Sequence, residues 1–156
     1  MNGWLLDTNV IAELTKAQGT TRVQNWAAAQ EEHSLFLSIL TLGEYDKGLH
    51  NVPVDNHLRL RISAGIVALE ARFAGRVLTL TDPIARRWGA ISGETKRLTG
   101  HAPPVIDTLL AATAIEHDLC LVTRNIRDVR HSGARLLNPW DHDPGGWRAA
   151  STRRSD

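Results

Sequence analysis

Apolar residues gather in five short runs along the chain, and within each run they are continuous rather than alternating with polar residues. Continuous apolar runs of this length are typical of strands that are buried on both faces of a parallel sheet. The pattern therefore predicts strands at these runs, which span residues 4–6, 35–37, 77–80, 119–122 and 136–137.

Between the runs, apolar residues recur at helical spacing. Steps of three and four residues predict helices over 58–73, 82–98 and 106–117, and Asp82-Pro83 is expected to cap the second of these helices. No helix is predicted between the fourth and fifth runs. Strands that alternate with helices indicate an α/β domain, in which helices cover the faces of the sheet.

The length of the chain, 156 residues, fits a single domain, which we expect to span 1–140. Prolines, glycines and arginines follow without periodicity, so 141–156 is predicted to be a flexible C-terminal tail. The one cysteine, Cys120, excludes an internal disulfide and favours a reducing compartment. Because the sequence shows no targeting or membrane-spanning segment, we expect a cytoplasmic protein that does not associate with a membrane.

The formal net charge of +1 hides an uneven distribution of charges along the chain. Residues 1–49 carry a net charge of −3, residues 50–101 carry +4, and the remainder is neutral. Local potential decides what a surface attracts, so a near-neutral total does not exclude a nucleic-acid partner. Solvated helix faces are the alternative explanation for the basic middle segment.

Polar residues follow the apolar runs at the positions where strands are predicted to end. Asp7-Thr8-Asn9 follows the first run, and Thr123-Arg124-Asn125 with Asp128 follows the fourth. Parallel strands have their carboxyl ends at one edge of the sheet, so these side chains are expected to line one crevice there. Asp107 opens the third predicted helix after Val105-Ile106 and is expected near the edge of the core, where a carboxylate needs a partner.

Each of these acidic positions also has a purely structural explanation. Residues 7–9 are favoured helix caps, Asp107 suits a helix N-terminus, and residues 125–128 suit a polar turn. Glu44 ends the stretch Thr41-Leu42-Gly43-Glu44, which has the form of a capping box, and its local sequence favours that role.

Several carboxylates at one edge would repel one another unless a divalent cation neutralised them. Ligand sets made only of oxygen favour a hard ion such as Mg²⁺ or Mn²⁺. The sequence has no Cys/His cluster with zinc-ligand spacing, no P-loop, no Gly-x-Gly-x-x-Gly and no Gly-x-Ser-x-Gly. The acidic residues therefore favour an oxygen-ligated metal site over a zinc, nucleotide or serine-hydrolase site.

In their order and spacing, several stretches make the chain resemble the PIN-domain ribonucleases, and within that family the VapC/FitB-type toxins of bacterial toxin–antitoxin pairs. The match covers residues 4–140 and rests on 5–11, 38–44 with Gly48, 106–114, 121–125 with Asp128, and 137–140. The resemblance implies a single PIN-like domain, with a five-stranded parallel sheet flanked by helices. It also implies an acidic pocket that holds Mg²⁺ or Mn²⁺.

The resemblance further implies a metal-dependent endoribonuclease that hydrolyses RNA phosphodiester bonds, as the toxin of a type II toxin–antitoxin system. Asp7, Glu44 and Asp107 match three core acidic positions of the family, which reverses the capping interpretation of Glu44. The fourth position stays open, because many relatives have Asp where this chain has Asn125, and Asp128 is the available carboxylate.

In the mechanism implied by this resemblance, Asp7 and Asp107 hold the metal ion directly. Glu44 and Asp128 bind a second ion or orient the attacking water. The remaining polar residues of the motifs position the phosphate or nearby waters, and these are Thr8, Asn9, Thr123 and Asn125.

The family resemblance implies three partners: an RNA substrate (transfer RNA is a frequent target in the family), a small antitoxin that occludes the pocket, and a second copy of the chain in a homodimer. Two other functions remain open. One is a non-catalytic PIN-like module that binds RNA or protein without cutting. The other is a receiver or phosphatase-type enzyme that handles phosphate at Asp7, but such sites use a lysine on a later strand, and Lys96 is the last lysine here.

Overall fold

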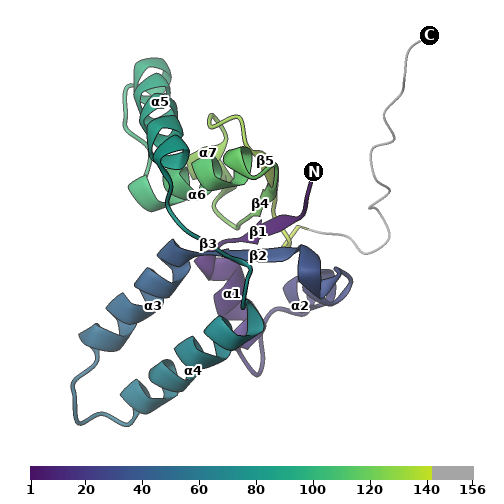
Figure 1. The fold of residues 1–156 in the computed structure, drawn as a ribbon, viewed down its shortest axis with the longest axis vertical. Helices are drawn as coiled ribbons and strands as arrows, with labels where there is room; N and C mark the ends of the chain where they lie inside the picture. The colour runs from purple at the N-terminus through teal and green to yellow at the C-terminus, as the bar shows by residue number, and fades with distance from the viewer. Residues whose placement is uncertain (142–156) are drawn as a thin grey trace.

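Five parallel strands in the order β3-β2-β1-β4-β5 form the centre of the computed structural model, which describes residues 1–141 (Figure 1). All five predicted strands are present, as β1 (Trp4–Leu6), β2 (Leu35–Ser38), β3 (Val77–Leu78), β4 (Cys120–Val122) and β5 (Arg135–Leu137). The strand at the β3 edge is shorter than expected: it ends at Leu78, and Leu80 is 44% exposed beyond the sheet. The predicted α/β class and the five-stranded parallel sheet are confirmed.

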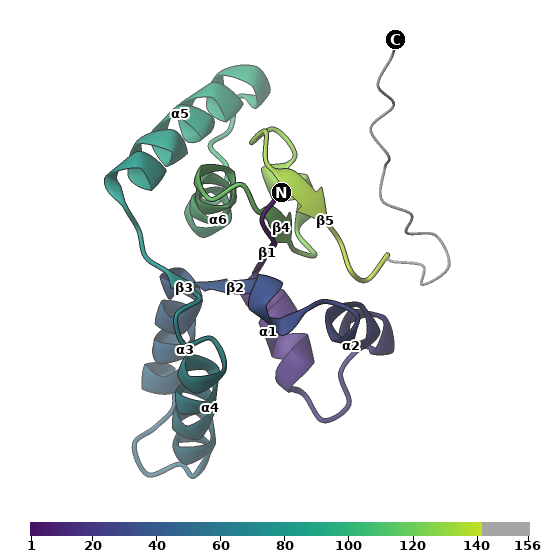
Figure 2. The same cartoon turned by 45° about the vertical axis from the view of Figure 1, so that its right-hand side comes forward.

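Seven α-helices within the described residues cover the two faces of the sheet. On one face lie α1 (Thr8–Thr15), α2 (Thr21–Ala28), α3 (Ile39–Asn51) and α4 (Leu58–Arg72), as Figure 1 shows. On the other face α5 (Asp82–Thr99) packs against α6 (Val105–Glu116), as Figure 2 shows, and α7 (Ile126–Val129) lies beside α6 (Figure 1). A 3-10 turn, Glu32–Ser34, precedes β2.

Alternation of side chains along β1 divides the core into two layers. Trp4 and Leu6 pack with α1, α2 and Phe73 on one face, whereas Leu5 packs with Leu110 of α6 on the other. Successive residues of a strand point to opposite faces, so three consecutive apolar residues are needed to cover both faces. This is the physical reason that the apolar runs are continuous.

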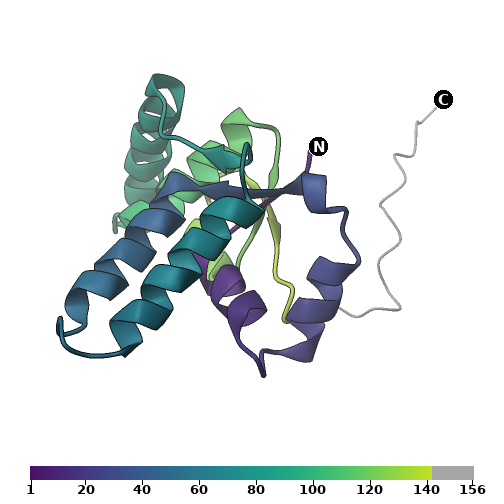
Figure 3. The same cartoon turned by 60° about the horizontal axis from the view of Figure 1, so that its bottom comes forward.

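The predicted helices need three corrections. The helix expected over 58–73 is α4, but only its C-terminal part is buried: Leu58 is 41% exposed and Leu69 is 4% exposed. Its N-terminal half lies in a hairpin with α3 that projects from the sheet (Figure 3). Asp82 does not cap α5, because Thr81 is the N-cap residue and Asp82 is already helical.

The third correction concerns the connection between β4 and β5, which we expected to contain no helix. Parallel strands need a crossover, and here the short helix α7 supplies part of it. Val129 of α7 is 3% exposed and anchors the connection in the core beside α6.

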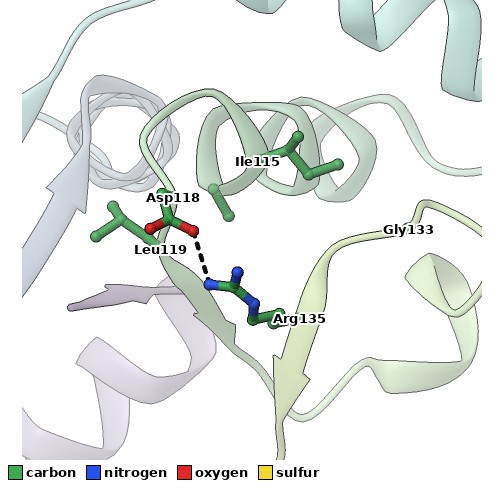
Figure 4. Close-up of a pocket in the computed structure, with 6 residues that line it drawn as sticks. Ile115, Asp118, Leu119, Gly133 and Arg135 are labelled. Carbon is green, nitrogen blue, oxygen red and sulfur yellow. Dashed lines mark hydrogen bonds and ion pairs between the residues drawn. The ribbon is translucent and has the colours of Figure 1, made fainter. Parts of the chain in front are cut away.

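At the edge of the sheet where the strands begin, Asp118 forms an ion pair with Arg135 of β5 (Figure 4). Asp118 has a left-handed backbone (φ 51°), and its carboxylate contacts the Met1 ammonium at 3.1 Å and Arg135 at 2.7 Å. The lone Cys120 is buried in β4, and burial raises the pKa of its thiol to about 11. The two ion pairs of Asp118 thus connect the N-terminus of the chain with the beginning of β5. The polar residues that follow the strands lie at the opposite edge of the sheet.

None of the helices between residues 1 and 141 is long and apolar enough to cross a bilayer. The tail predicted over 141–156 lies outside the described residues apart from Asp141, whose backbone N–H donates to the Asn138 carbonyl.

Candidate active site

Asp7 lies at the carboxyl end of the central strand, where the chain order reverses. β1 pairs with β2 on one side and with β4 on the other, so the connections from β1 to β2 and from β3 to β4 run in opposite directions across the sheet. In open α/β sheets, ligands bind beyond the carboxyl end of the strand at which this reversal occurs. Asp7 is 5% exposed, and its carboxylate accepts hydrogen bonds from the Thr8 amide (2.6 Å), Thr123 Oγ1 (2.7 Å) and Asn9 Nδ2 (3.1 Å). It is also the N-cap of α1. The capping interpretation of Asp7 is therefore confirmed, and the crevice at this edge of the sheet stays a prediction.

Opposing influences act on the ionisation of Asp7. Burial raises the pKa of its carboxyl, and the negative charge of Glu44 raises it further. Hydrogen bonds from Thr123, Thr8 and Asn9 lower that pKa, because they stabilise the charged form. The net direction is upward, so burial outweighs the three donors.

Glu44 lies on α3, whose beginning excludes the capping-box interpretation. The N-cap of α3 is Ser38, whose Oγ accepts the Leu40 amide at 3.1 Å, and Thr41 is already inside the helix and fully buried. The carboxylate of Glu44 instead accepts a hydrogen bond from the Thr8 hydroxyl, next to Asp7. Glu44 thus faces the carboxyl end of β1.

Thr41 is a member of this cluster that the sequence analysis did not identify as a site residue. Its Oγ1 lies 3.0 Å from Oγ1 of Thr8, which connects α3 to α1. Its position three residues before Glu44 places both side chains on the same face of a helix, and this spacing was the available signal.

Asp107 lies in the first turn of α6 but does not cap it, because Pro104 occupies the N-cap position. Burial raises the pKa of Asp107 to about 6, and the negative charges of Asp7, Asp128 and Glu44 contribute to the rise. Within residues 1–141, no donor forms a hydrogen bond with this carboxylate. Asp107 is therefore a partly buried acid surrounded by other acids.

The two candidates for the fourth position, Asp128 and Asn125, have different surroundings. Asp128 lies in α7, and its charge acts on Asp107. Asn125 is the N-cap residue of α7, but its side chain makes no capping bond, and its backbone N–H donates to Thr123 Oγ1 at 2.9 Å. The negative charge of Asp128 therefore acts on the acidic group, whereas the backbone N–H of Asn125 donates a hydrogen bond to Thr123.

The donor chemistry of the site fits a hard divalent cation. Four carboxylates come from the end of β1 and from α3, α6 and α7, and their mutual repulsion contributes to the raised pKa of Asp107. Yet within residues 1–141 no three His, Cys, Asp or Glu side chains are arranged so that they could hold a metal ion as they stand. The carboxylates of Asp7 and Glu44 accept hydrogen bonds from Thr123 and Thr8, which fix their directions.

The basic middle segment is not gathered around this acidic group. Arg59 donates to the Val52 carbonyl in the α3–α4 connection, and Arg87 forms an ion pair with Glu116. Arg124 lies closer to the site: its backbone N–H donates to Asn9 Oδ1 at 3.3 Å, and its guanidinium lies 5.2 Å from the centre of the Trp140 ring.

Comparisons of the sequence and of the structure with known proteins give relatives that agree with each other. Residues 4–132 match the family model of the PIN domain. Toxin FitB of Neisseria gonorrhoeae is 34% identical over 142 residues, covering 89% of this chain and 99% of the relative. VapC ribonuclease Y4jK of Sinorhizobium fredii is 31% identical over 140 residues, covering 88% and 97%. A structure of FitAB bound to an IR36 DNA fragment superposes with a TM-score of 0.77 at 29% identity, covering 90% of this chain and 97% of that chain.

Proposed function

Because this chain belongs to the PIN-domain family, we propose that it is a metal-dependent endoribonuclease and the toxin of a type II toxin–antitoxin pair. One structural observation carries the proposal. Four carboxylates from separate elements, Asp7, Glu44, Asp107 and Asp128, surround the end of the central strand, and their repulsion helps to raise the pKa of Asp107 to about 6. Relatives that are named as a toxin and as a ribonuclease support the reaction class.

In this proposal Asp7 and Asp107 hold Mg²⁺ or Mn²⁺. The ion, when bound, supplies positive charge that lowers the pKa of the attacking water and offsets charge on the phosphodiester. Asp107 suits this role because its carboxylate has no hydrogen-bond donor within residues 1–141 and its ionisation is opposed by neighbouring acids. Asp7 is held rigidly by its donors, chiefly Thr123 and the Thr8 amide.

The other polar residues orient the reacting groups. Glu44 and Asp128 face the cluster from α3 and α7, where either carboxylate can accept a proton from the attacking water. The Thr8 hydroxyl donates to Glu44 and fixes its direction. Asn9 Nδ2 donates to Thr123 Oγ1 at 3.4 Å, and Thr123 is 1% exposed, so Thr123 acts on the phosphate only indirectly, by orienting Asn9 and Asp7.

We further propose a cognate antitoxin, a homodimer and a cytoplasmic location. Structures of FitAB and FitAcB are among the structural neighbours of the chain. Leu60 and Val67, seven residues apart on α4, are 76% and 62% exposed, so an apolar face of this helix is available to a protein partner. Light scattering of the purified chain tests the dimer, and a monomer at micromolar concentration would exclude it.

The proposed reaction is tested by incubating total RNA and purified transfer RNA with the protein in Mg²⁺, in Mn²⁺ and in EDTA. We expect cleavage with either ion, none in EDTA, and none with Asp7→Ala. Asp46→Ala is the matched control, because Asp46 is an exposed acid on the same helix as Glu44. Cleavage that survives in Asp7→Ala would exclude the assignment of the site.

A non-catalytic PIN-like module is the second candidate. The absence of a ready three-ligand group within residues 1–141 favours it. Calorimetric titration with Mn²⁺ separates the two functions: the nuclease is expected to bind the ion and to lose binding in Asp107→Asn, whereas the module would bind none.

A further inference from the structure

A cleft of about 250 Å³ has Asp128 among the residues that line it. It is formed by the end of α5, the connection from α5 to α6, and α7. Its lining includes two arginines and two histidines, but Asp128 is its one carboxylate. The site proposed above and this cleft therefore share Asp128. The basic residues in the lining are Arg127, Arg130, His101 and His131.

The two arginines leave positive charge available in the cleft. Within residues 1–141 neither Arg127 nor Arg130 forms a salt bridge, and both are exposed. Arg130 Nε donates to Nε2 of His131 at 3.1 Å, and this bond leaves the two terminal nitrogens of the guanidinium free to bind an anion. A cleft with two guanidinium groups and a single carboxylate favours an anion over a cation.

The opposite wall is preformed and offers flat surfaces. The backbone N–H of His101 donates to Thr99 Oγ1 at 3.3 Å, and His101 Nδ1 lies 3.2 Å from the Thr99 carbonyl oxygen. Pro103 and Pro104 follow and restrict the backbone of the connection. An imidazole ring and a proline ring are surfaces on which an unpaired nucleic-acid base can lie.

On the basis of the proposed function, we propose that this cleft binds one nucleotide of single-stranded RNA next to the phosphodiester that is cut. Arg127 and Arg130 hold the backbone phosphate, and His101 contacts the base. The carboxylates of an acidic peptide would satisfy the arginines but offer no aromatic ring to stack on the His101 imidazole. Because Asp128 lies in both places, a nucleotide bound here is directly continuous with the acidic cluster.

The test uses the full chain in EDTA, so that binding is measured without cleavage. Fluorescence anisotropy with a labelled single-stranded RNA of roughly 12 nucleotides reports affinity across a salt series. The double variant Arg127→Gln, Arg130→Gln keeps side-chain length while removing the charge. The comparison variant Arg61→Ala, Arg86→Ala removes the same charge from α4 and α5, at exposed residues that do not line the cleft.

We expect the cleft variant to bind the RNA at least about tenfold more weakly at 0.1 M salt and to show a shallower salt dependence, because two phosphate contacts are lost. His101→Ala is expected to weaken binding on the order of tenfold with an unchanged salt slope, because a base contact carries no charge. Equal losses in the cleft and comparison variants would overturn the proposal in favour of diffuse binding by the basic middle segment.

A polyglutamate peptide of matched charge serves as a competitor. RNA that is displaced by polyglutamate as well as by unlabelled RNA would overturn the proposal, because it would indicate a cleft for acidic peptides. Thermal unfolding of each variant verifies that it is folded. Failure of the proposed function is seen separately, as wild-type protein that binds RNA through the cleft but does not cleave it in Mg²⁺.

Discussion

Thr123 Oγ1 donates a 2.7 Å hydrogen bond to Oδ2 of Asp7 and thereby joins the carboxyl ends of β4 and β1. The same oxygen accepts the Asn125 amide at 2.9 Å, so one hydroxyl connects the buried acid to the turn that leads into α7. Thr123 is 1% exposed, and no solvent substitutes for this donor. The ionised form of Asp7 therefore depends on a residue 116 positions away in the chain.

Replacement of Thr123 by Val removes this donor without changing the shape of the side chain. We expect a loss of about 1.5–3 kcal/mol in the free energy of unfolding at pH 7, since a hydrogen bond to a charged, buried group is lost. The loss should be smaller at about pH 4, where Asp7 is more protonated. Urea unfolding at both pH values measures it. Thr113→Val is the control, because Thr113 is equally buried but bonds only the Leu109 carbonyl of its own helix.

The stability of the metal-free protein is expected to fall as the pH rises from about 4 to about 6. In this window Asp107 has lost its proton in the unfolded chain (pKa 3.8) but keeps it in the folded one (pKa about 6), so the folded state binds more protons. At about 1.4 kcal/mol per pKa unit the shift would correspond to about 3 kcal/mol, and solvent screening of this partly buried carboxyl makes the contribution smaller than that.

Urea unfolding of the wild type and of Asp107→Asn in EDTA isolates this contribution, because other groups titrate in both proteins. The free energy of unfolding of Asp107→Asn should rise relative to that of the wild type up to about pH 6, and the difference should then stay constant. Added Mg²⁺ at pH 7 should stabilise the wild type and not the variant. Parallel pH curves in EDTA would contradict the assignment of the raised pKa.

Glu44 and Asp46 are neighbouring acids on α3 with different surroundings. Glu44 accepts a hydrogen bond from Thr8, whereas Asp46 is exposed. We expect Glu44→Gln to lower the rate of Mg²⁺-dependent RNA cleavage by about 100-fold or more, as expected for loss of a group that orients or deprotonates water. Asp46→Asn should cleave within about twofold of the wild type. Single-turnover gel assays make the comparison, and similar rates for both variants would remove Glu44 from the site.

The same assay separates Asp128 from Asn125. Asp128→Asn removes a charge that acts on Asp107, so both cleavage and Mn²⁺ affinity should fall by about tenfold or more. Asn125→Ala keeps the backbone N–H that donates to Thr123, so its effect should be smaller. A larger effect at Asn125 would assign the fourth position to the amide.

Much of the fold followed from local patterns. The apolar runs predicted all five strands because a strand that is covered on both faces must be apolar at consecutive positions, as in Trp4, Leu5 and Leu6. The patterns were less successful at the ends of helices. Leu58 has helical spacing but is 41% exposed, since periodicity shows that a face is apolar and not that another element covers it.

Glu44 shows where local chemistry misleads. Thr41 and Glu44 have the spacing of a capping box, but α3 begins at Ile39 with Ser38 as its cap. This spacing places both side chains on one face of α3. In the tertiary structure that face contacts Thr8, the residue next to Asp7. The local residues favoured a capping box, which α3 does not have, whereas the family resemblance assigns Glu44 to the acidic site, and that assignment stays a prediction.

By itself, the sequence determined the strands, the class of the fold and the identity of the acids that follow the strands, because these depend on neighbours a few positions apart. Only the tertiary structure decided that Thr123 holds Asp7, that the charge of Asp128 acts on Asp107, and that arginines from a segment of neutral net charge line the cleft beside the acids. These relationships depend on burial and on distances between charges, which are set by how the crossovers pack and not by spacing along the chain.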